Sequence, residues 1–152
     1  MQRITTFLTF NDQGKAAVDF YVSVFKNSKV HSIMVMPGSD RLLHASFSLD
    51  GRDFMAMDGG EHFTFTDGVS MFVNCENQDE VDYYWNALTA DGGEEGQCGW
   101  LKDAYGVSWQ VVPKQLGELM QSPNPARSQR VMEAMLNMTK IDVAALQAAH
   151  NA

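Results

Sequence analysis

Hydrophobic and polar residues alternate in several short stretches of the chain, a pattern typical of β-strands with one buried face. In the first half, this alternation predicts strands over residues 4–10, 30–36, 42–49 and 52–57. Between the first two strands, the apolar residues of 15–25 recur at helical spacing. Turn signals at Pro37-Gly38 and Asp50-Gly51 separate the later strands. The first half is therefore predicted to have the order β-α-β-β-β.

The second half of the chain repeats this order. Strands are predicted over 69–75, 96–101 and 107–112, with a helix over 79–90 after the first of them. The two helices share a similar segment, Val18-Asp19-Phe20-Tyr21 in one and Val81-Asp82-Tyr83-Tyr84 in the other. Residues 50–55 are likewise paralleled by residues 105–110. Two matches in the same order indicate a duplicated module, although each match is short.

The stretch 98–113 is the most informative part of the chain. Asp103 to Gly106 has the composition of a tight turn, and Pro113 ends the strand that follows. In that strand, Val107, Trp109 and Val111 point to one face, whereas Ser108, Gln110 and Val112 point to the other. A single carboxamide, Gln110, therefore lies on the less apolar face.

The last forty residues are predicted to be helical. A short helix covers 114–121, Ser122-Pro123-Asn124-Pro125 interrupts it, and two further helices follow. The first of these two helices has an apolar stripe that contains Val131, Met132, Met135, Leu136 and Met138. These helices either cover the sheet or a partner subunit, or form a methionine-rich gate over a pocket.

Length and composition favour one compact domain. The 152 residues, 45% of them hydrophobic, suffice for a real core, with modules at 1–62 and 68–113 and C-terminal helices at 114–150. The formal charge of −8 disfavours nucleic acids and anionic membranes as partners. No apolar run approaches the roughly 20 residues of a membrane span. Cys75 and Cys98 form no zinc-site spacing, and the N-terminus begins directly with a strand-like segment, so a bacterial, cytoplasmic location is expected.

Each predicted strand has two different faces. One carries core residues: Leu8, Phe10, Leu43, Ala45, Phe47, Leu49, Phe54, Val69, Met71, Val73 and Trp109. The other mixes small hydroxyls with Phe and Met, where a solvated face would carry Lys and Glu. Its candidate pocket residues are Thr5, Phe7, His44, Ser46, Met55, Met57, Ser70, Phe72, Asn74, Ser108 and Gln110. This pattern favours a lined cavity, and a solvated or interface face is the alternative.

His44 is the candidate catalytic residue because a neutral imidazole on the pocket face could act as a general base. A histidine that only fills space there is the alternative. The sequence contains no Ser-His-Asp order, phosphate loop or nucleotide fingerprint, so no cofactor is expected.

Several segments together resemble the vicinal oxygen chelate superfamily, which includes glyoxalases, bleomycin resistance proteins and extradiol dioxygenases. Within it, the chain is similar to the PhnB-like group, often labelled with a 3-demethylubiquinone-9 3-methyltransferase domain. The resemblance is carried by Met55 to Gly60, Glu80 to Trp85, Cys98 to Asp103, Gly106 to Pro113, and Val131 to Asp142. It implies an α+β fold whose two β-α-β-β-β modules form a cup-shaped mixed sheet, often assembled as a homodimer.

The resemblance also implies a divalent metal site on the concave face, at positions that correspond here to Thr5, Met55, Ser70 and Gln110. Neutral hydroxyls and a thioether are poor ligands for such a cation, and a single amide oxygen cannot hold it. No metal is therefore expected.

A methyltransferase would use a doubly wound sheet with a Gly-rich first turn. The corresponding turn, Asn11-Asp12-Gln13-Gly14, lacks that pattern, so methyl transfer is not expected.

These observations lead to one principal hypothesis and two alternatives. The principal hypothesis is a metal-free protein that binds a small, partly apolar molecule in a concave-sheet pocket. The first alternative is a lyase, isomerase or dioxygenase of the same superfamily, using a metal or His44. The second is a structural dimer whose cavity has lost its function.

Overall fold

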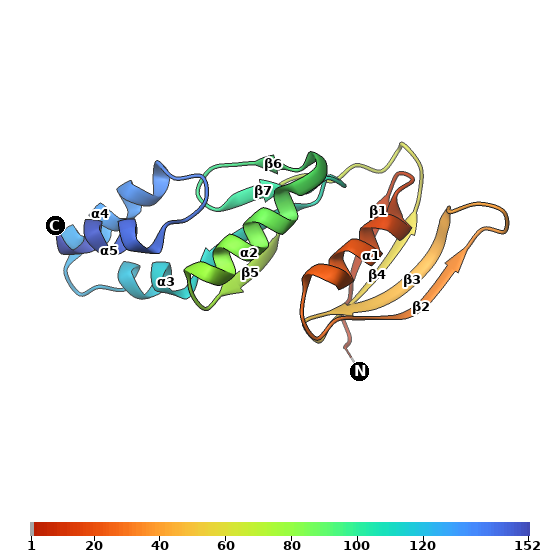
Figure 1. Ribbon diagram of the computed structural model, residues 1–152, viewed down its shortest axis with the longest axis horizontal. Coiled ribbons are helices and arrows are strands. Elements are labelled where there is room, and N and C mark those ends of the chain that lie inside the picture. Colours follow the sequence, from red (N-terminus) through yellow and green to blue (C-terminus); the bar gives the residue numbers. More distant parts are fainter. Residues whose placement is uncertain (1) are drawn as a thin grey trace. The chain divides into compact units, whose positions relative to one another are not determined.

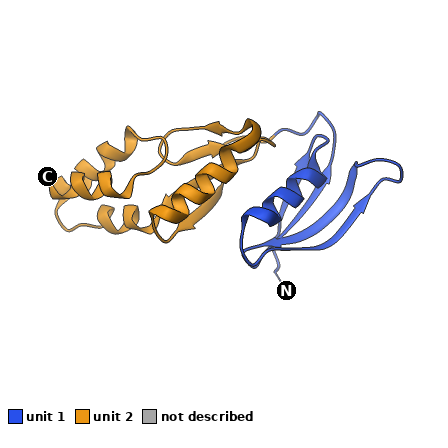
Figure 2. Cartoon of the chain, viewed as in Figure 1, with its two compact units in different colours: residues 1–64 blue, residues 65–152 orange. Residues whose placement is uncertain are grey.

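The computed structural model describes residues 2–152 and has the α+β architecture that the sequence predicts (Figure 1). The chain divides into two compact units, Met1–Thr64 and Phe65–Ala152 (Figure 2). The elements of the first unit are β1 (Thr6–Phe10), α1 (Gly14–Val24), β2 (Lys29–Val35), β3 (Leu42–Leu49) and β4 (Arg52–Asp58). The second module contains β5 (Met71–Cys75), α2 (Gln78–Thr89), β6 (Glu94–Glu95), β7 (Trp100–Lys102) and β8 (Ser108–Pro113). The predicted β-α-β-β-β repeat is confirmed.

Each module forms a four-stranded mixed sheet with the same topology. The strand orders are β1-β4-β3-β2 and β5-β8-β7-β6. In each sheet the first and last strands of the module pair in parallel, and the remaining neighbours pair antiparallel. The registers place Phe7 beside Met55 in one sheet and Phe72 beside Gln110 in the other. Met55 and Gln110 therefore occupy equivalent central positions.

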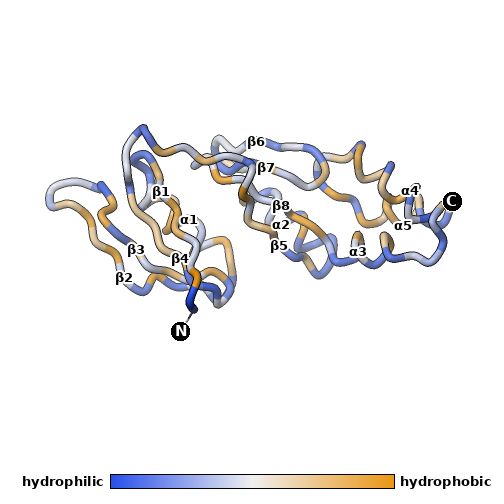
Figure 3. The backbone as a smooth tube through the Cα atoms, turned by 180° about the vertical axis from the view of Figure 1, so that it is seen from behind, coloured by the Kyte–Doolittle hydropathy of each residue, from blue (hydrophilic) through white to orange (hydrophobic). Residues whose placement is uncertain are grey.

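Helix α1 covers one face of the first sheet. Its buried residues Ala17, Val18 and Tyr21 belong to the same core as Phe47 and Phe54. The two phenyl rings are stacked, with centroids 5.5 Å apart and planes at 17°. Hydrophobic stretches along the strands of each unit are visible in Figure 3. The alternation of the strands thus separates a helix-covered face from an open one.

Three local predictions are wrong. Leu43 is 39% exposed, and its neighbour Leu42 is fully buried instead, because a register shift between β2 and β3 inserts one extra residue there. Val69 is 71% exposed because β5 begins only at Met71. The strand predicted over 96–101 begins only at Trp100, the first residue of β7. The residues before Trp100 form a turn, and the two-residue strand β6 precedes this turn.

A buried carboxylate joins α1 to the sheet. Asp58 is only 2% exposed, and its two oxygens accept hydrogen bonds from the backbone N–H groups of Gly14 and Leu42, both at 2.8 Å. A Cβ on Gly14 would lie 2.6 Å from the Asp58 carboxylate, so only glycine fits at this helix start. The carboxylate also lies at the N-terminus of α1, where negative charge is favourable.

In the second unit, Asp103 plays a similar part at the β7–β8 turn. Its carboxylate, 3% exposed, accepts hydrogen bonds from the backbone N–H groups of Tyr105 and Val107 and from Nε1 of Trp109. Trp109 is consequently oriented into the core on β8, the strand that packs against α2 and its buried residues Val81 and Trp85. The tight turn predicted over Asp103 to Gly106 is confirmed.

The C-terminal helices α3 (Lys114–Met120), α4 (Pro125–Leu136) and α5 (Val143–Asn151) build a small core of their own rather than covering the sheet. Val131, Ile141 and Leu146 are fully buried in it. Leu116, Leu119, Met120, Met135 and Met138 pack against these three. Met135 and Met138 of the predicted gate therefore belong to this core, whereas Met132 is 44% exposed. No helix within residues 2–152 is long and apolar enough to cross a membrane.

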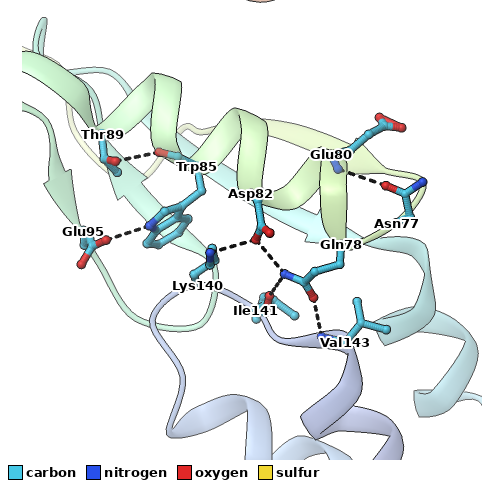
Figure 4. A network of polar contacts seen from close by, with 10 residues as sticks. All are labelled: Asn77, Gln78, Glu80, Asp82, Trp85, Thr89, Glu95, Lys140, Ile141 and Val143. Carbon is cyan, nitrogen blue, oxygen red and sulfur yellow. Dashed lines mark hydrogen bonds and ion pairs between the residues drawn. The ribbon is translucent and has the colours of Figure 1, made fainter.

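Polar contacts from α2 hold this helical tail (Figure 4). The Gln78 carboxamide accepts from the backbone N–H of Val143 at 2.7 Å and donates to the carbonyl of Ile141 at 3.0 Å. It also donates to Asp82, whose carboxylate pairs with Lys140 at 2.8 Å. The hydrogen bond from Lys140, followed by that from Gln78, lowers the pKa of Asp82.

The tail also reaches the turn before β7. The backbone N–H groups of Cys98 and Gly99 donate to the carbonyls of Met138 and Thr139, both at 2.8 Å. Gly99 has a φ of 84°, and a Cβ there would lie 2.9 Å from the Val111 carbonyl oxygen. The turn that leads into Trp100 is thus fixed by residues about forty positions later in the chain.

We expect Asp58→Ala to destabilise the first unit strongly. The substitution leaves two buried N–H groups without an acceptor, each at a cost of roughly 1–3 kcal/mol. The free energy of unfolding, measured by chemical denaturation, should fall by about 3 kcal/mol. The exposed Asp40→Ala is the matched control and should change it little. Equal stability of the two variants would contradict this role of Asp58.

The tail contact should weaken in acid. Because the folded state lowers the pKa of Asp82, its contribution to stability is complete above the unfolded value near 3.8 and is lost as the pH falls through the folded value. Asp82→Asn should therefore be less stable than the parent at pH 7, by at most about 1 kcal/mol because both partners are substantially exposed. Denaturation at pH 7, 5 and 3 should show this difference shrinking at the lowest pH. A constant difference would exclude the ion pair as its cause.

Candidate ligand-binding faces of the two sheets

The sheet face opposite α1 is the first candidate surface, and we call it the open face of unit 1. Its residues come from three adjacent strands: Phe7 and Thr9, Met55 and Met57, and His44 and Ser46. Within the described part of this unit α1 is the only helix, and it covers the other face. The open face is apolar at its centre because Phe7 and Met55 are direct neighbours.

Aromatic and polar groups alternate across this face. The rings of Phe7 and His44 lie 6.3 Å apart at an angle of 57°. The hydroxyl oxygens of Ser46 and Ser32 lie 2.8 Å apart and share a hydrogen bond. His44 is half-buried, and no side-chain hydrogen bond joins its imidazole to any of residues 2–152. Its nitrogens are therefore available to a ligand.

Phe63 adds an aromatic ring at the edge of this face, which the sequence did not indicate. A Cβ on Gly59 would lie 2.6 Å both from the Phe63 ring and from Cγ2 of Thr9. The loop after β4 therefore brings Phe63 next to Thr9. Only the missing side chain of Gly59 leaves room for the ring, and loop contacts of this kind give no periodic signal.

The open face of unit 2 lies opposite α2. It carries Phe72 and Asn74 from β5, Gln110 from β8 and Trp100 from β7. Gln110 pairs in register with Phe72 on one side and with Trp100 on the other. Its side-chain Nε2 donates a hydrogen bond to Oγ of Ser70, which precedes β5, at 3.0 Å. A carboxamide flanked by two aromatic rings is the central feature of this surface.

The eleven predicted pocket residues fall into two groups. Thr5, Phe7, His44, Ser46, Met55 and Met57 lie in unit 1, and Ser70, Phe72, Asn74, Ser108 and Gln110 lie in unit 2. Ser108 is 3% exposed, so it offers a ligand almost no surface. Trp100, which is not among the eleven predicted pocket residues, is half-buried beside Gln110.

The implied metal positions do not fit a divalent cation. Thr5 and Met55 belong to unit 1, Ser70 and Gln110 to unit 2, and the Gln110 carboxamide already bonds the Ser70 hydroxyl. The set therefore offers neutral oxygens and one thioether, which bind hard cations poorly. Among residues 2–152 no three His, Cys, Asp or Glu side chains gather into a metal-binding cluster.

Neither cysteine adds a reactive group to these faces. Cys75 is buried in the core, and this burial, with the nearby charge of Glu80, raises the pKa of its thiol to about 12. A thiol with such a pKa is almost entirely protonated near neutral pH and is a poor nucleophile. Cys98 lies in the turn fixed by the C-terminal tail.

Comparison with known proteins identifies the family. Residues 2–112 match the family model described as 3-demethylubiquinone-9 3-methyltransferase. The PhnB protein from Bacillus cereus is 35% identical, with a TM-score of 0.69 over 74% of this chain and 99% of that one. No curated protein matches the chain in sequence.

Two further solved structures share the fold at lower identity. Protein PA1353 from Pseudomonas aeruginosa is 21% identical, with a TM-score of 0.59 over 74% of this chain and 98% of that one. The fosfomycin resistance protein FosX from Listeria monocytogenes is 16% identical, with a TM-score of 0.59 over 80% and 98%. The chain belongs to the family described as 3-demethylubiquinone-9 3-methyltransferase, the PhnB-like group of the vicinal oxygen chelate superfamily.

Proposed function

We propose that this protein binds a small, partly apolar molecule on the open face of a sheet, without a metal. The observation that supports this most directly is the exposure of equivalent aromatic residues in the two modules. Phe7 is 43% exposed and Phe72 is 51% exposed, each at the same position of its sheet and beside polar side chains. Apolar surface next to a few convergent polar groups is the usual composition of ligand sites.

The proposed function does not include methyl transfer, although the family's description names it. Methyl-donor sites of the common type require a parallel, doubly wound sheet with a Gly-rich turn after its first strand. Here each sheet is mixed, and β1 is followed by Asn11-Asp12-Gln13-Gly14. Neither feature provides the backbone cradle that such a site needs.

An enzyme with His44 as general base is the second candidate. The support is the position of the imidazole: half-buried on the open face of unit 1, against Phe7, with no side-chain hydrogen bond to any described residue. A base that is not engaged with a protein partner can accept a proton from a bound molecule. The reactions open to a lone base include isomerisation and elimination.

Ligand screening by thermal shift tests the proposed function. A molecule that binds only the folded protein stabilises it, by about 2.7 kcal/mol at a hundred times its Kd. We expect some molecules to raise the melting temperature of the parent protein, and this increase should disappear in Phe7→Ser or Phe72→Ser. The matched control is Tyr83→Ser, which removes an equally exposed aromatic ring from α2, on the other side of the second sheet. Hits that survive both face variants, or no hits at all, would refute the proposal.

The second candidate is tested at one position. If His44 is the base, His44→Ala should lower turnover of any substrate found among the hits by roughly 10²–10⁴-fold, because that is the usual contribution of a general base. The affinity of the His44→Ala variant for the substrate should differ much less from that of the parent. Steady-state kinetics separate these effects through kcat and KM. Undiminished kcat in His44→Ala would remove the catalytic role.

A further inference from the structure

The side chains of Gln110 and Ser70 form a polar pair at the centre of the open face of unit 2. Gln110 lies on β8, between Phe72 on β5 and Trp100 on β7, so three side chains stand in one row across the sheet. Neighbouring strands of a sheet lie about 4.7–4.9 Å apart, so the three side chains of this row stand close together. A ligand a few ångströms wide can therefore contact both rings and the carboxamide at once.

The hydrogen bond between the pair determines what remains for a ligand. Nε2 of Gln110 donates to Oγ of Ser70, which fixes the orientation of the carboxamide. No other side-chain hydrogen bond of Gln110 involves residues 2–152, so Oε1 is left as an acceptor. The second Nε2 hydrogen and the Ser70 hydroxyl hydrogen are left as donors. The row thus presents an acceptor next to a donor, as an amide edge does.

The charges around the row favour an uncharged ligand. Lys102 is the cation on the strand of Trp100, two residues further along the same face. Glu94 on β6 lies opposite Lys102 in the strand register, and its negative charge offsets that of the lysine. The remaining side chains that share this face on β5 and β8 are neutral. An anion would therefore gain little here, and a cation would meet no carboxylate on β5, β7 or β8.

We propose that this row selects an uncharged planar ring with a lactam edge, an N–H next to a carbonyl. The ring N–H donates to Oε1 of Gln110, and the ring carbonyl accepts from the free donors of Gln110 and Ser70. The flat surface of the ring packs against Phe72 and Trp100, which favours aromatic over aliphatic ligands. This inference depends on the proposed function, since it requires that the open face of unit 2 binds a small molecule.

Three related probes test the proposal by isothermal titration with the full chain. 2-Quinolinone has the lactam edge, N-methyl-2-quinolinone lacks the N–H donor, and quinoline-2-carboxylate replaces the edge with an anion. We expect 2-quinolinone to bind at least tenfold more tightly than each of the other two, which corresponds to about 1.4 kcal/mol. Equal or tighter binding of the N-methyl compound or the carboxylate would overturn the proposal.

Substitutions then locate the selectivity. Gln110→Leu removes the acceptor and the donors at similar size, so the preference for 2-quinolinone over its N-methyl form should vanish. The second variant is Ser70→Ala. Because position 70 precedes β5, this substitution should disturb folding less than Gln110→Leu, and it should reduce the preference for 2-quinolinone severalfold. Gln129→Leu, on the exposed surface of α4, is the matched control and should keep it. An unchanged preference in both Gln110→Leu and Ser70→Ala would overturn the proposal.

Failure of this inference is distinguishable from failure of the proposed function. If hits from the thermal-shift screen are lost in Phe72→Ser but carry no lactam edge, the lactam selectivity is overturned and small-molecule binding stands. If 2-quinolinone and all other hits bind Phe7→Ser and Phe72→Ser as they bind the parent, both are overturned.

Discussion

Parallel pairing of the first and last strands of each module is the constraint on which the rest of the structure depends. It brings β1 to β4 and β5 to β8, although the register partners Thr6 and Phe54, and Met71 and Trp109, are far apart along the chain. The same pairing sets the crossover helix on one face and leaves the other face open. Phe7 meets Met55 and Phe72 meets Gln110 only because these registers hold. The candidate binding surface is thus a consequence of strand order.

Buried carboxylates secure the ends of this arrangement, differently in the two units. Asp58 joins the start of α1 to β3 and β4, whereas Asp103 closes the β7–β8 turn and orients Trp109. The duplicated modules therefore share a topology, but their buried carboxylates bond different parts of the module. The difference extends to the open faces, where a thioether at Met55 corresponds to a carboxamide at Gln110. If the modules bind molecules, their preferences should differ accordingly.

The C-terminal helices add a third kind of contact to the second unit. They lie beyond residue 112, where the match to the family model ends. Their own small core makes these helices compact. The Gln78 carboxamide holds them against α2, because it accepts a hydrogen bond from the backbone N–H of Val143 and donates one to the backbone carbonyl of Ile141. Through Met138 and Thr139 the tail also holds the turn before Trp100. It thereby supports one of the two rings beside Gln110.

The sequence by itself determined the α+β class, the repeated module and the face on which Phe7, Met55, Phe72 and Gln110 lie, because strand periodicity is a local property. Only the tertiary structure decided what depends on register and on distant contacts. The bulge that exposes Leu43, the ring of Phe63 beside Thr9, the burial of Ser108, the place of Trp100 and the Gln110–Ser70 bond are of this kind. Such features arise between segments far apart in the chain, so no local pattern encodes them.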